Sequence, residues 1–158
     1  MLEIELFNLL EGTSDADFVV TDQGEICSWN KAAENLFGYT AEEAINKTCG
    51  NVLQGQGALG NEMCGENCSI SHRAEKRLEI PNFDLQVKTR SGRRVWLSVS
   101  ILVYENPRNH RRLIVHLAHD ITERKKNEVL LHKMIDVSRQ LSSIQEVALK
   151  PMPITPPS

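Results

Sequence analysis

Residues 18–39 read FVVTDQGEICSWNKAAENLFGY and carry the signals of three consecutive elements. Two β-prone runs, FVVT and EICSW, flank a turn in which Gly24 can supply the positive φ that a tight hairpin requires. Asn30 then stands at the N-cap position of a helix that Gly38 ends. The stretch therefore predicts a β-hairpin followed directly by a short helix.

The apolar residues predict the remaining elements through their spacing. Leucines at helical spacing indicate a leading helix in residues 1–12, and Thr40 opens a capping box for a second short helix after the hairpin. The glycine-rich segment 50–60 cannot hold a long regular element, and the next helix is expected at about residues 68–76. From Phe83 the period is two, which predicts an antiparallel meander of three strands.

Residues 123–150 contain neither glycine nor proline and predict one long helix, with Asp120 as its N-cap. We expect this helix to form a homodimer through residues 127–148, although packing of its apolar stripe on its own domain is an alternative. The proline-rich residues 151–158 are expected to be a linker to an output domain. The stripe has the alternating four- and three-residue spacing of a coiled-coil seam and consists of Leu130, Met134, Val137, Leu141, Ile144 and Ala148.

The composition is that of an ordinary globular protein. Of the 158 residues, 41% are hydrophobic and 25% charged, with a formal net charge of -3, so neither disorder nor binding of nucleic acid is indicated. The N-terminus lacks the features of a signal peptide, and no apolar run is long enough to span a membrane. We therefore expect a cytoplasmic protein with one main domain, residues 13–122, and no membrane contact.

Two patches resemble the PAS domain family. The run LLEGTSDADFVVTDQGEICSWNKAAENLFGYTAEEAI is similar to the opening of that family, whose N-x-x-A-x-x-L-F-G-Y pattern is matched from Asn30 to Tyr39. The run AHDITERKK at 118–126 is similar to its closing D-I-T-E-R-K. The resemblance implies an α+β PAS fold, with a five-stranded antiparallel sheet of order 2-1-5-4-3, flanking short helices and a C-terminal signalling helix.

The resemblance also implies a sensor rather than an enzyme. Such modules precede an output domain and signal through the helix after D-I-T, which here points to His119, Asp120 and Thr122. The run NFDLQVKTRSGRRVWLSVSILV and the cysteine-bearing loop look like the PAS inputs of LuxR-type transcription regulators. We expect no catalytic residues, because no nucleophile, base or phosphate-loop motif is visible. A ligand pocket is expected to be lined by Phe18, Val20, Leu36, Leu53, Phe83, Leu97, Val99 and Val115.

Three of the four cysteines lie near one another in the sequence, followed by a histidine. Cys64, Cys68 and His72 are four residues apart on an expected helix, and Cys49 precedes them across a glycine loop. Three thiolates and an imidazole suit zinc, and thiolates also suit an iron–sulfur cluster. One alternative is that the cysteines are buried as small apolar residues, since free cysteine is among the most buried residue types. The other is a thiol switch, because cysteines near a helix N-terminus have a lowered thiol pKa.

Flavin and haem are two further candidate cofactors for the same segment. Flavin is not favoured, because alignment with the light-sensing LOV motif puts Gly50 at the reactive cysteine position. Haem would use His72 as its axial ligand, whereas the polar sequence around it indicates a surface side chain. His116 and His119 point to opposite faces of a strand and cannot form a joint site. The function is therefore sensing of a ligand, metal or redox state, or ligand-free dimerisation with buried structural cysteines.

Overall fold

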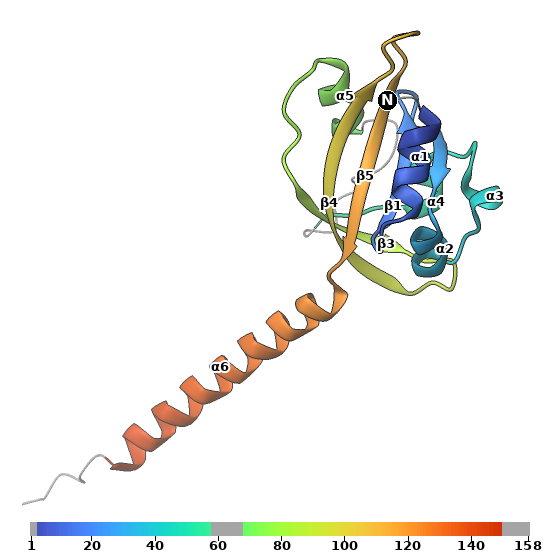
Figure 1. Ribbon diagram of the computed structural model, residues 1–158. Coiled ribbons are helices and arrows are strands. Elements are labelled where there is room, and N and C mark those ends of the chain that lie inside the picture. The colour runs from blue at the N-terminus through green and yellow to red at the C-terminus, as the bar shows by residue number, and fades with distance from the viewer. Residues whose placement is uncertain (1–2, 58–67, 150–158) are drawn as a thin grey trace, which may run out of the picture. The chain divides into compact units, whose positions relative to one another are not determined.

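The computed structural model describes the backbone of residues 3–57 and 68–149. The described residues form an α+β fold in which a five-stranded antiparallel sheet is flanked by short helices and followed by a long one, which confirms the expected fold class (Figure 1). The elements in chain order are α1 (Glu3–Glu11), β1 (Ala16–Thr21), β2 (Ile26–Trp29), α2 (Lys31–Phe37), α3 (Ala41–Ala44), α4 (Cys49–Leu53), α5 (Ser69–Glu75), β3 (Phe83–Lys88), β4 (Arg94–Glu105), β5 (Arg112–Asp120) and α6 (Thr122–Leu149).

The opening hairpin and helix form as their sequence predicts. Gly24 adopts a φ of 82° in the turn between β1 and β2. The side chain of Asn30 accepts a hydrogen bond from the backbone N–H of Ala33 at 2.9 Å and so caps α2. Gly38 ends α2 with a φ of 83°, and a Cβ at this position would stand 3.1 Å from the Cβ of Arg90. Both the dihedral angle and the close approach therefore require glycine there.

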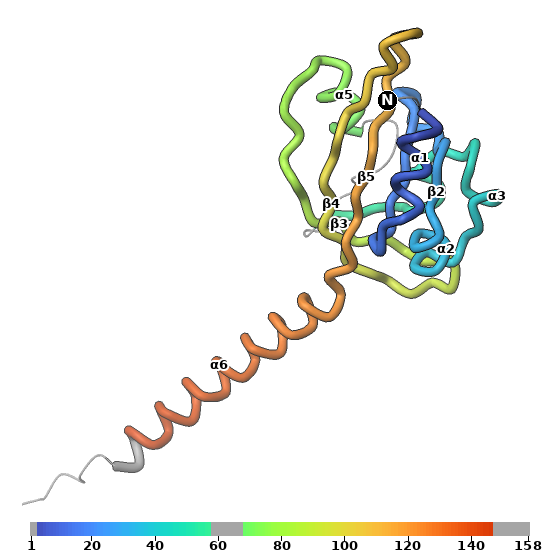
Figure 2. Tube along the Cα trace, in the orientation of Figure 1, coloured from blue at the N-terminus to red at the C-terminus, as the bar shows by residue number. Residues whose placement is uncertain are grey.

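The strand order β2-β1-β5-β4-β3 confirms the order that the resemblance implied. This order places β2 at one edge of the sheet, next to β1, and β2 is labelled in Figure 2. The first and last strands are neighbours, and their register pairs Ala16 with Ala118 and Phe18 with His116. The entrance to β1 therefore lies beside the exit of β5, where the chain passes into α6.

Each face of the sheet carries its own apolar cluster. On one face, α1 contributes Leu10 to a small cluster with Val19, Leu113 and Val115. On the other face, helices α2 to α5 cover a much larger cluster. We call these the α1 face and the core face. All five strands contribute buried residues to the core face. The helices contribute Ala33, Phe37, Ala44, Val52, Leu53 and Ala74.

The segment after α3 is more ordered than its glycines suggest. Residues 49–53 form α4, which buries Val52 and Leu53 in the core and ends at Gln54 with a positive φ of 48°. The helix is only five residues long, in keeping with the expectation that no long element forms there. Burial of Val52 and Leu53 and the hydrogen bond from the backbone N–H of Cys49 to the carbonyl of Gly24 therefore help to hold this short helix in place.

The chain divides into two units, residues 1–122 and 123–158. The first contains the sheet and helices α1 to α5, and the second contains most of α6, a single helix of 28 residues. In the part of the chain that the structure describes, no helix has the length and apolar character needed to cross a membrane. The proposed linker at 151–158 lies outside the described residues.

Candidate functional site

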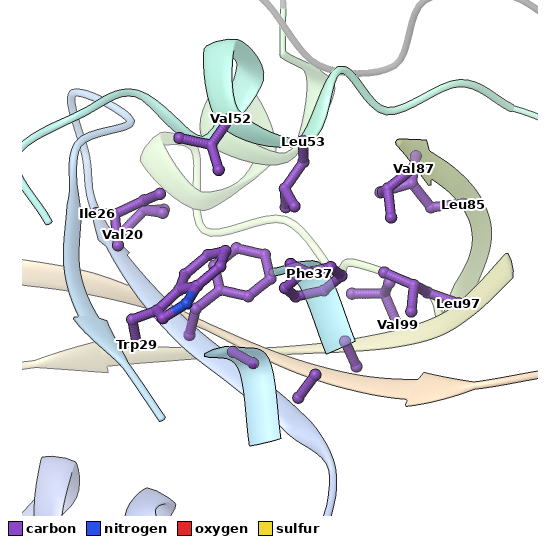
Figure 3. Packing of buried hydrophobic residues seen from close by; sticks show 14 of the residues in the cluster. Val20, Ile26, Trp29, Phe37, Val52, Leu53, Leu85, Val87, Leu97 and Val99 are labelled. Atoms are coloured by element: carbon purple, nitrogen blue, oxygen red, sulfur yellow. The ribbon is translucent and has the colours of Figure 1, made fainter. Parts of the chain in front are cut away.

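The core face holds most of the residues that the sequence assigned to a ligand pocket. Phe18, Val20, Leu53, Leu97 and Val99 are buried in one cluster. Figure 3 shows the side chains of Val20, Leu53, Leu97 and Val99 within this cluster. Two further predicted residues, Leu36 and Phe83, are partly buried and pack against the same cluster. These seven side chains therefore share one surface of the sheet and its helices, and their role as the wall of a ligand pocket stays a prediction.

Val115 does not share that surface. It is buried on the α1 face, in the cluster of Val19 and Leu113. The register pairs Phe18 with His116, so His116 and not Val115 lies beside Phe18 on the core face. The assignment of Val115 to the pocket is corrected accordingly, since adjacent residues of a strand face opposite sides.

Aromatic side chains occupy the middle of the core face. The ring centroids of Phe18 and Trp29 are 5.5 Å apart, and those of Trp29 and Phe37 are 5.2 Å apart. The indole N–H of Trp29 donates to the backbone carbonyl of Tyr39 at 3.0 Å, so its polar atom is satisfied. Three large rings thus fill space between β1, β2 and α2.

His116 is the polar side chain of the core face that the sequence did not single out. Its imidazole stacks on Phe18 with centroids 4.4 Å apart and planes inclined by 15°, and Nδ1 lies 3.3 Å from the carbonyl of Ile114. Burial lowers the pKa of His116 to about 4 because the charged form cannot be solvated there. The ring is therefore neutral at pH 7 and is available as a polar group inside an apolar cluster.

A second buried polar group ties the start of the domain together. Asn30 is 1% exposed, and its amide donates to the carbonyls of Leu10 and Asp15, each at 2.9 Å. Its oxygen accepts from the backbone N–H of Asp17 at 3.1 Å. Burial raises the pKa of the Asp17 carboxyl, which also accepts from the hydroxyl of Thr13. The N-cap of α2 therefore also fixes the end of α1 against β1.

The described candidates for metal or redox chemistry do not form one site. The backbone N–H of Cys49 donates to the carbonyl of Gly24 at 3.1 Å, and Cys49 packs at the margin of the core cluster. Cys68 is the N-cap residue of α5 and His72 lies within that helix, and both line one groove. Among residues 3–57 and 68–149, no three side chains of the metal-binding types converge on a point. Cys64 lies outside these ranges.

Cys27 is the fourth cysteine of the chain and lies outside the segment that carries Cys49, Cys64 and Cys68. It is half-buried in β2, and its sulfur donates to the carbonyl of Val19 at 3.5 Å. Burial raises the pKa of Cys27 to about 11, so the thiol stays protonated at pH 7 and is a poor nucleophile. Cys27 is therefore a structural side chain of the α1 face.

The residues predicted to transmit a signal lie together where β5 ends. The Nδ1 atom of His119 is 2.9 Å from a carboxylate oxygen of Asp15, which precedes β1. Asp120 accepts from both the backbone N–H and the hydroxyl of Thr122, at 2.9 and 2.6 Å. The same hydroxyl accepts from the backbone N–H of Trp96 at 3.0 Å. The first residue of α6 is thereby bonded to β4 and to β5.

This combination defines a class of protein: an α+β domain whose antiparallel sheet carries a helix-covered apolar interior on one face and is followed by a long C-terminal helix. A family model described as "PAS domain" matches residues 14–123, which is more than half of the chain. The chain belongs to the PAS domain family. A comparison with curated proteins gives no match.

Solved structures show the same fold. An RNA-binding light-oxygen-voltage receptor matches with a TM-score of 0.63 at 19% identity, covering 85% of this chain and 37% of the receptor. The PAS domain of the fruit-fly ELK potassium channel matches with a TM-score of 0.59 at 17% identity, covering 77% of this chain and 98% of that domain. The PAS domain of nitrogen regulation protein NR(II) from Vibrio parahaemolyticus gives 0.54 at 17%, covering 72% and 97%. At these identities, the likeness concerns the fold.

Proposed function

We propose that the chain is the sensory PAS module of a bacterial signalling protein, acting in the cytoplasm and without catalytic activity of its own. In this proposal two copies associate through residues 127–148 of α6. A change in the domain of residues 1–122 then alters the geometry of the two helices, and an output domain reads that change. A DNA-binding output of the LuxR type is one such reader, in keeping with the resemblance of residues 82–103.

The observation that carries the proposal is the exposed apolar seam of α6. Five side chains of the predicted stripe are between 53% and 63% exposed, although the stripe has the spacing of a coiled coil. A helix of this length with an uncovered seam is expected to associate, because burial of apolar area is the main favourable term in association. The five are Leu130, Met134, Val137, Leu141 and Ile144.

The hydrogen bonds at Thr122 supply a path from sheet to helix. A shift of β4 or β5 moves the donor at Trp96 or the acceptor at Asp120, and both are bonded to the hydroxyl of Thr122. The backbone N–H of Ile121 also donates to the carbonyl of Trp96, at 2.8 Å. Displacement of the sheet and of the first turn of α6 is therefore coupled in this proposal.

A small molecule fits the described residues better as the input than a metal does. A zinc or iron–sulfur site would need Cys64, which lies outside the described residues, together with ligands that Cys49, Cys68 and His72 do not supply as one group. A ligand-free dimerisation module is the second candidate. It is favoured by the packed rings of Phe18, Trp29 and Phe37. An ultraviolet–visible spectrum with metal analysis of protein purified without oxygen separates these inputs.

The association itself is tested with two glutamate variants of the same helix. Val137 lies on the seam and Val129 lies off it, and their exposed fractions are 53% and 55%. In sedimentation velocity, Val137→Glu is expected to weaken the dimer by at least about ten-fold, because two carboxylates must lose water in the seam. Val129→Glu is expected to leave the dimer intact. A monomeric wild-type chain, or equal effects of the two variants, would refute the proposed interface.

A further inference from the structure

A polar groove lies outside the apolar core, between α5, the β1–β2 turn and the start of β5. Its volume is about 790 Å³, large enough for a small molecule. One wall is a polar face of α5, on which Ser71, His72 and Glu75 recur at helical spacing. The opposite wall is the turn with Asp22, and Arg112 lies at the entrance to β5. The core begins behind this groove, where Ala74 is 2% exposed.

The charged groups of this groove have no partners within the described residues. Arg112 is half-buried, yet its guanidinium makes no hydrogen bond or ion pair there, and the same holds for the carboxylates of Asp22 and Glu75. The neighbouring Arg111 behaves differently, since its guanidinium lies 3.4 Å from a carboxylate oxygen of Glu3. A half-buried guanidinium without a partner among the described residues offers its donor fork to a carboxylate.

The sheet register brings a carboxylate close to this guanidinium. The last pair of β1 and β5 is Thr21 with Leu113, so Asp22 and Arg112 follow one step further along the same two strands. They form no ion pair with each other, which leaves one cationic and one anionic group side by side. That pairing complements the ammonium and carboxylate of an α-amino acid.

The second carboxylate sets the charge of the ligand. With histidine counted as neutral, the described lining residues carry one guanidinium and two carboxylates, a formal charge of -1. A ligand with a second cationic group balances this charge. Glu75 on α5 is the remaining carboxylate that can pair with that cationic group. Ser71 and Gln23 add a hydroxyl and an amide to the lining.

We propose that this groove binds a basic α-amino acid, with the carboxylate on Arg112, the α-ammonium on Asp22 and the side-chain cation on Glu75. The inference rests on the proposed sensory function, for which it names the class of ligand. A bound molecule would join α5 to the β1–β2 turn and to the first residue of β5. Occupancy of the groove would therefore bear on the strand that leads into α6.

Isothermal titration calorimetry of the whole chain with L-lysine tests the inference. Three analogues each lack one charged group: cadaverine lacks the carboxylate, 6-aminohexanoate the α-amino group and L-norleucine the side-chain amine. We expect saturable binding of L-lysine at one molecule per chain and binding at least about ten-fold weaker for each analogue. No heat with L-lysine at millimolar concentration, or equal binding of L-lysine and cadaverine, would overturn the inference.

Two variants assign the groups. Arg112→Gln is expected to weaken L-lysine by about ten-fold or more while leaving cadaverine unchanged, and Arg111→Gln is the matched control that should alter neither. Glu75→Gln is expected to weaken L-lysine and leave L-norleucine unchanged. Unchanged fluorescence unfolding midpoints show that each variant is folded. Equal losses with Arg111→Gln and Arg112→Gln would place the ligand elsewhere. The dimer measured by sedimentation is a separate readout, so failure of the groove and failure of the interface are distinguishable.

Discussion

Leu97 in β4 and Leu141 in α6 are the same residue in opposite situations. Leu97 is 0% exposed and packs on the core face, whereas Leu141 is 56% exposed on a helix whose seam is uncovered. The domain of residues 1–122 has a buried apolar core, whereas the apolar side chains of the α6 seam are exposed. Buried apolar residues of the domain are therefore expected to act on folding, and those of the α6 seam on the proposed association.

The largest expected effect comes from truncating these two leucines. Leu97→Ala should lower the free energy of unfolding of the domain by about 2–5 kcal/mol, because it removes buried methyl groups and leaves a cavity. Leu141→Ala should change it by less than about 0.5 kcal/mol. Both tryptophans, Trp29 and Trp96, lie within residues 1–122, so their fluorescence in urea reports on the domain.

In an association assay, the order of the effects of the same two variants should be reversed. Leu141→Ala is expected to weaken the dimer in sedimentation velocity, and Leu97→Ala to leave it unchanged under conditions where the domain remains folded. If Leu141→Ala destabilises the domain as much as Leu97→Ala does, α6 packs on its own domain and the contrast between the two regions fails.

His116 should make the stability of the domain depend on pH. Its pKa is about 4 in the folded protein, against an ordinary value of 6.5, so the unfolded chain binds a proton in this window and the folded chain does not. The free energy of unfolding therefore falls as the pH is lowered from about 6.5 to about 4, by up to about 3 kcal/mol. Urea unfolding followed by tryptophan fluorescence at a series of pH values measures this loss.

His116→Phe is the control for that pH dependence. A phenyl ring can retain the stack on Phe18 and cannot be protonated. The difference between wild type and variant should grow as the pH falls below about 6.5, while groups common to both cancel. Parallel stability curves for the two proteins would show that His116 is not buried as a neutral ring.

A smaller effect is expected at the junction with α6. Thr122→Val removes the hydroxyl that accepts from Trp96 and donates to Asp120, and should cost about 1 kcal/mol. Hydrogen exchange should accelerate in the first turn of α6. Ser142→Ala, which removes a hydroxyl further along the same helix, is the control and should leave that turn unchanged.

Local sequence patterns were sufficient to predict the helices and strands. They were insufficient to predict which face of the sheet each strand residue occupies. Asn30 and Gly38 act through neighbours in the sequence, so the cap and the stop could be read directly. The position of Val115 depends on how β1 and β5 align, and these strands are far apart in the chain. A change of one residue in that register exchanges the two faces of the sheet, which is why the sequence alone did not show that Val115 lies on the α1 face.

The groove could not be anticipated for a similar reason. Its residues come from α5, a hairpin turn and the first residue of β5, and only the folded chain brings them together. The sequence drew attention to the cysteines, whereas Asp22, Glu75 and Arg112, which line the same groove as Cys68, have charged groups without partners in the part of the chain that the structure describes. The alternation of β5 did carry one usable signal, since it places Arg112 and His116 on the same face as Ile114.

Native-state hydrogen exchange at several protein concentrations tests the central claim most directly. If α6 is covered by a second copy, protection of the amides around Val137 and Leu141 should rise with concentration, while protection in β1, β4 and β5 should stay constant. The account predicts this divergence between the two regions. Protection of α6 that does not depend on concentration, at the level of the sheet or at that of an isolated helix, would contradict it.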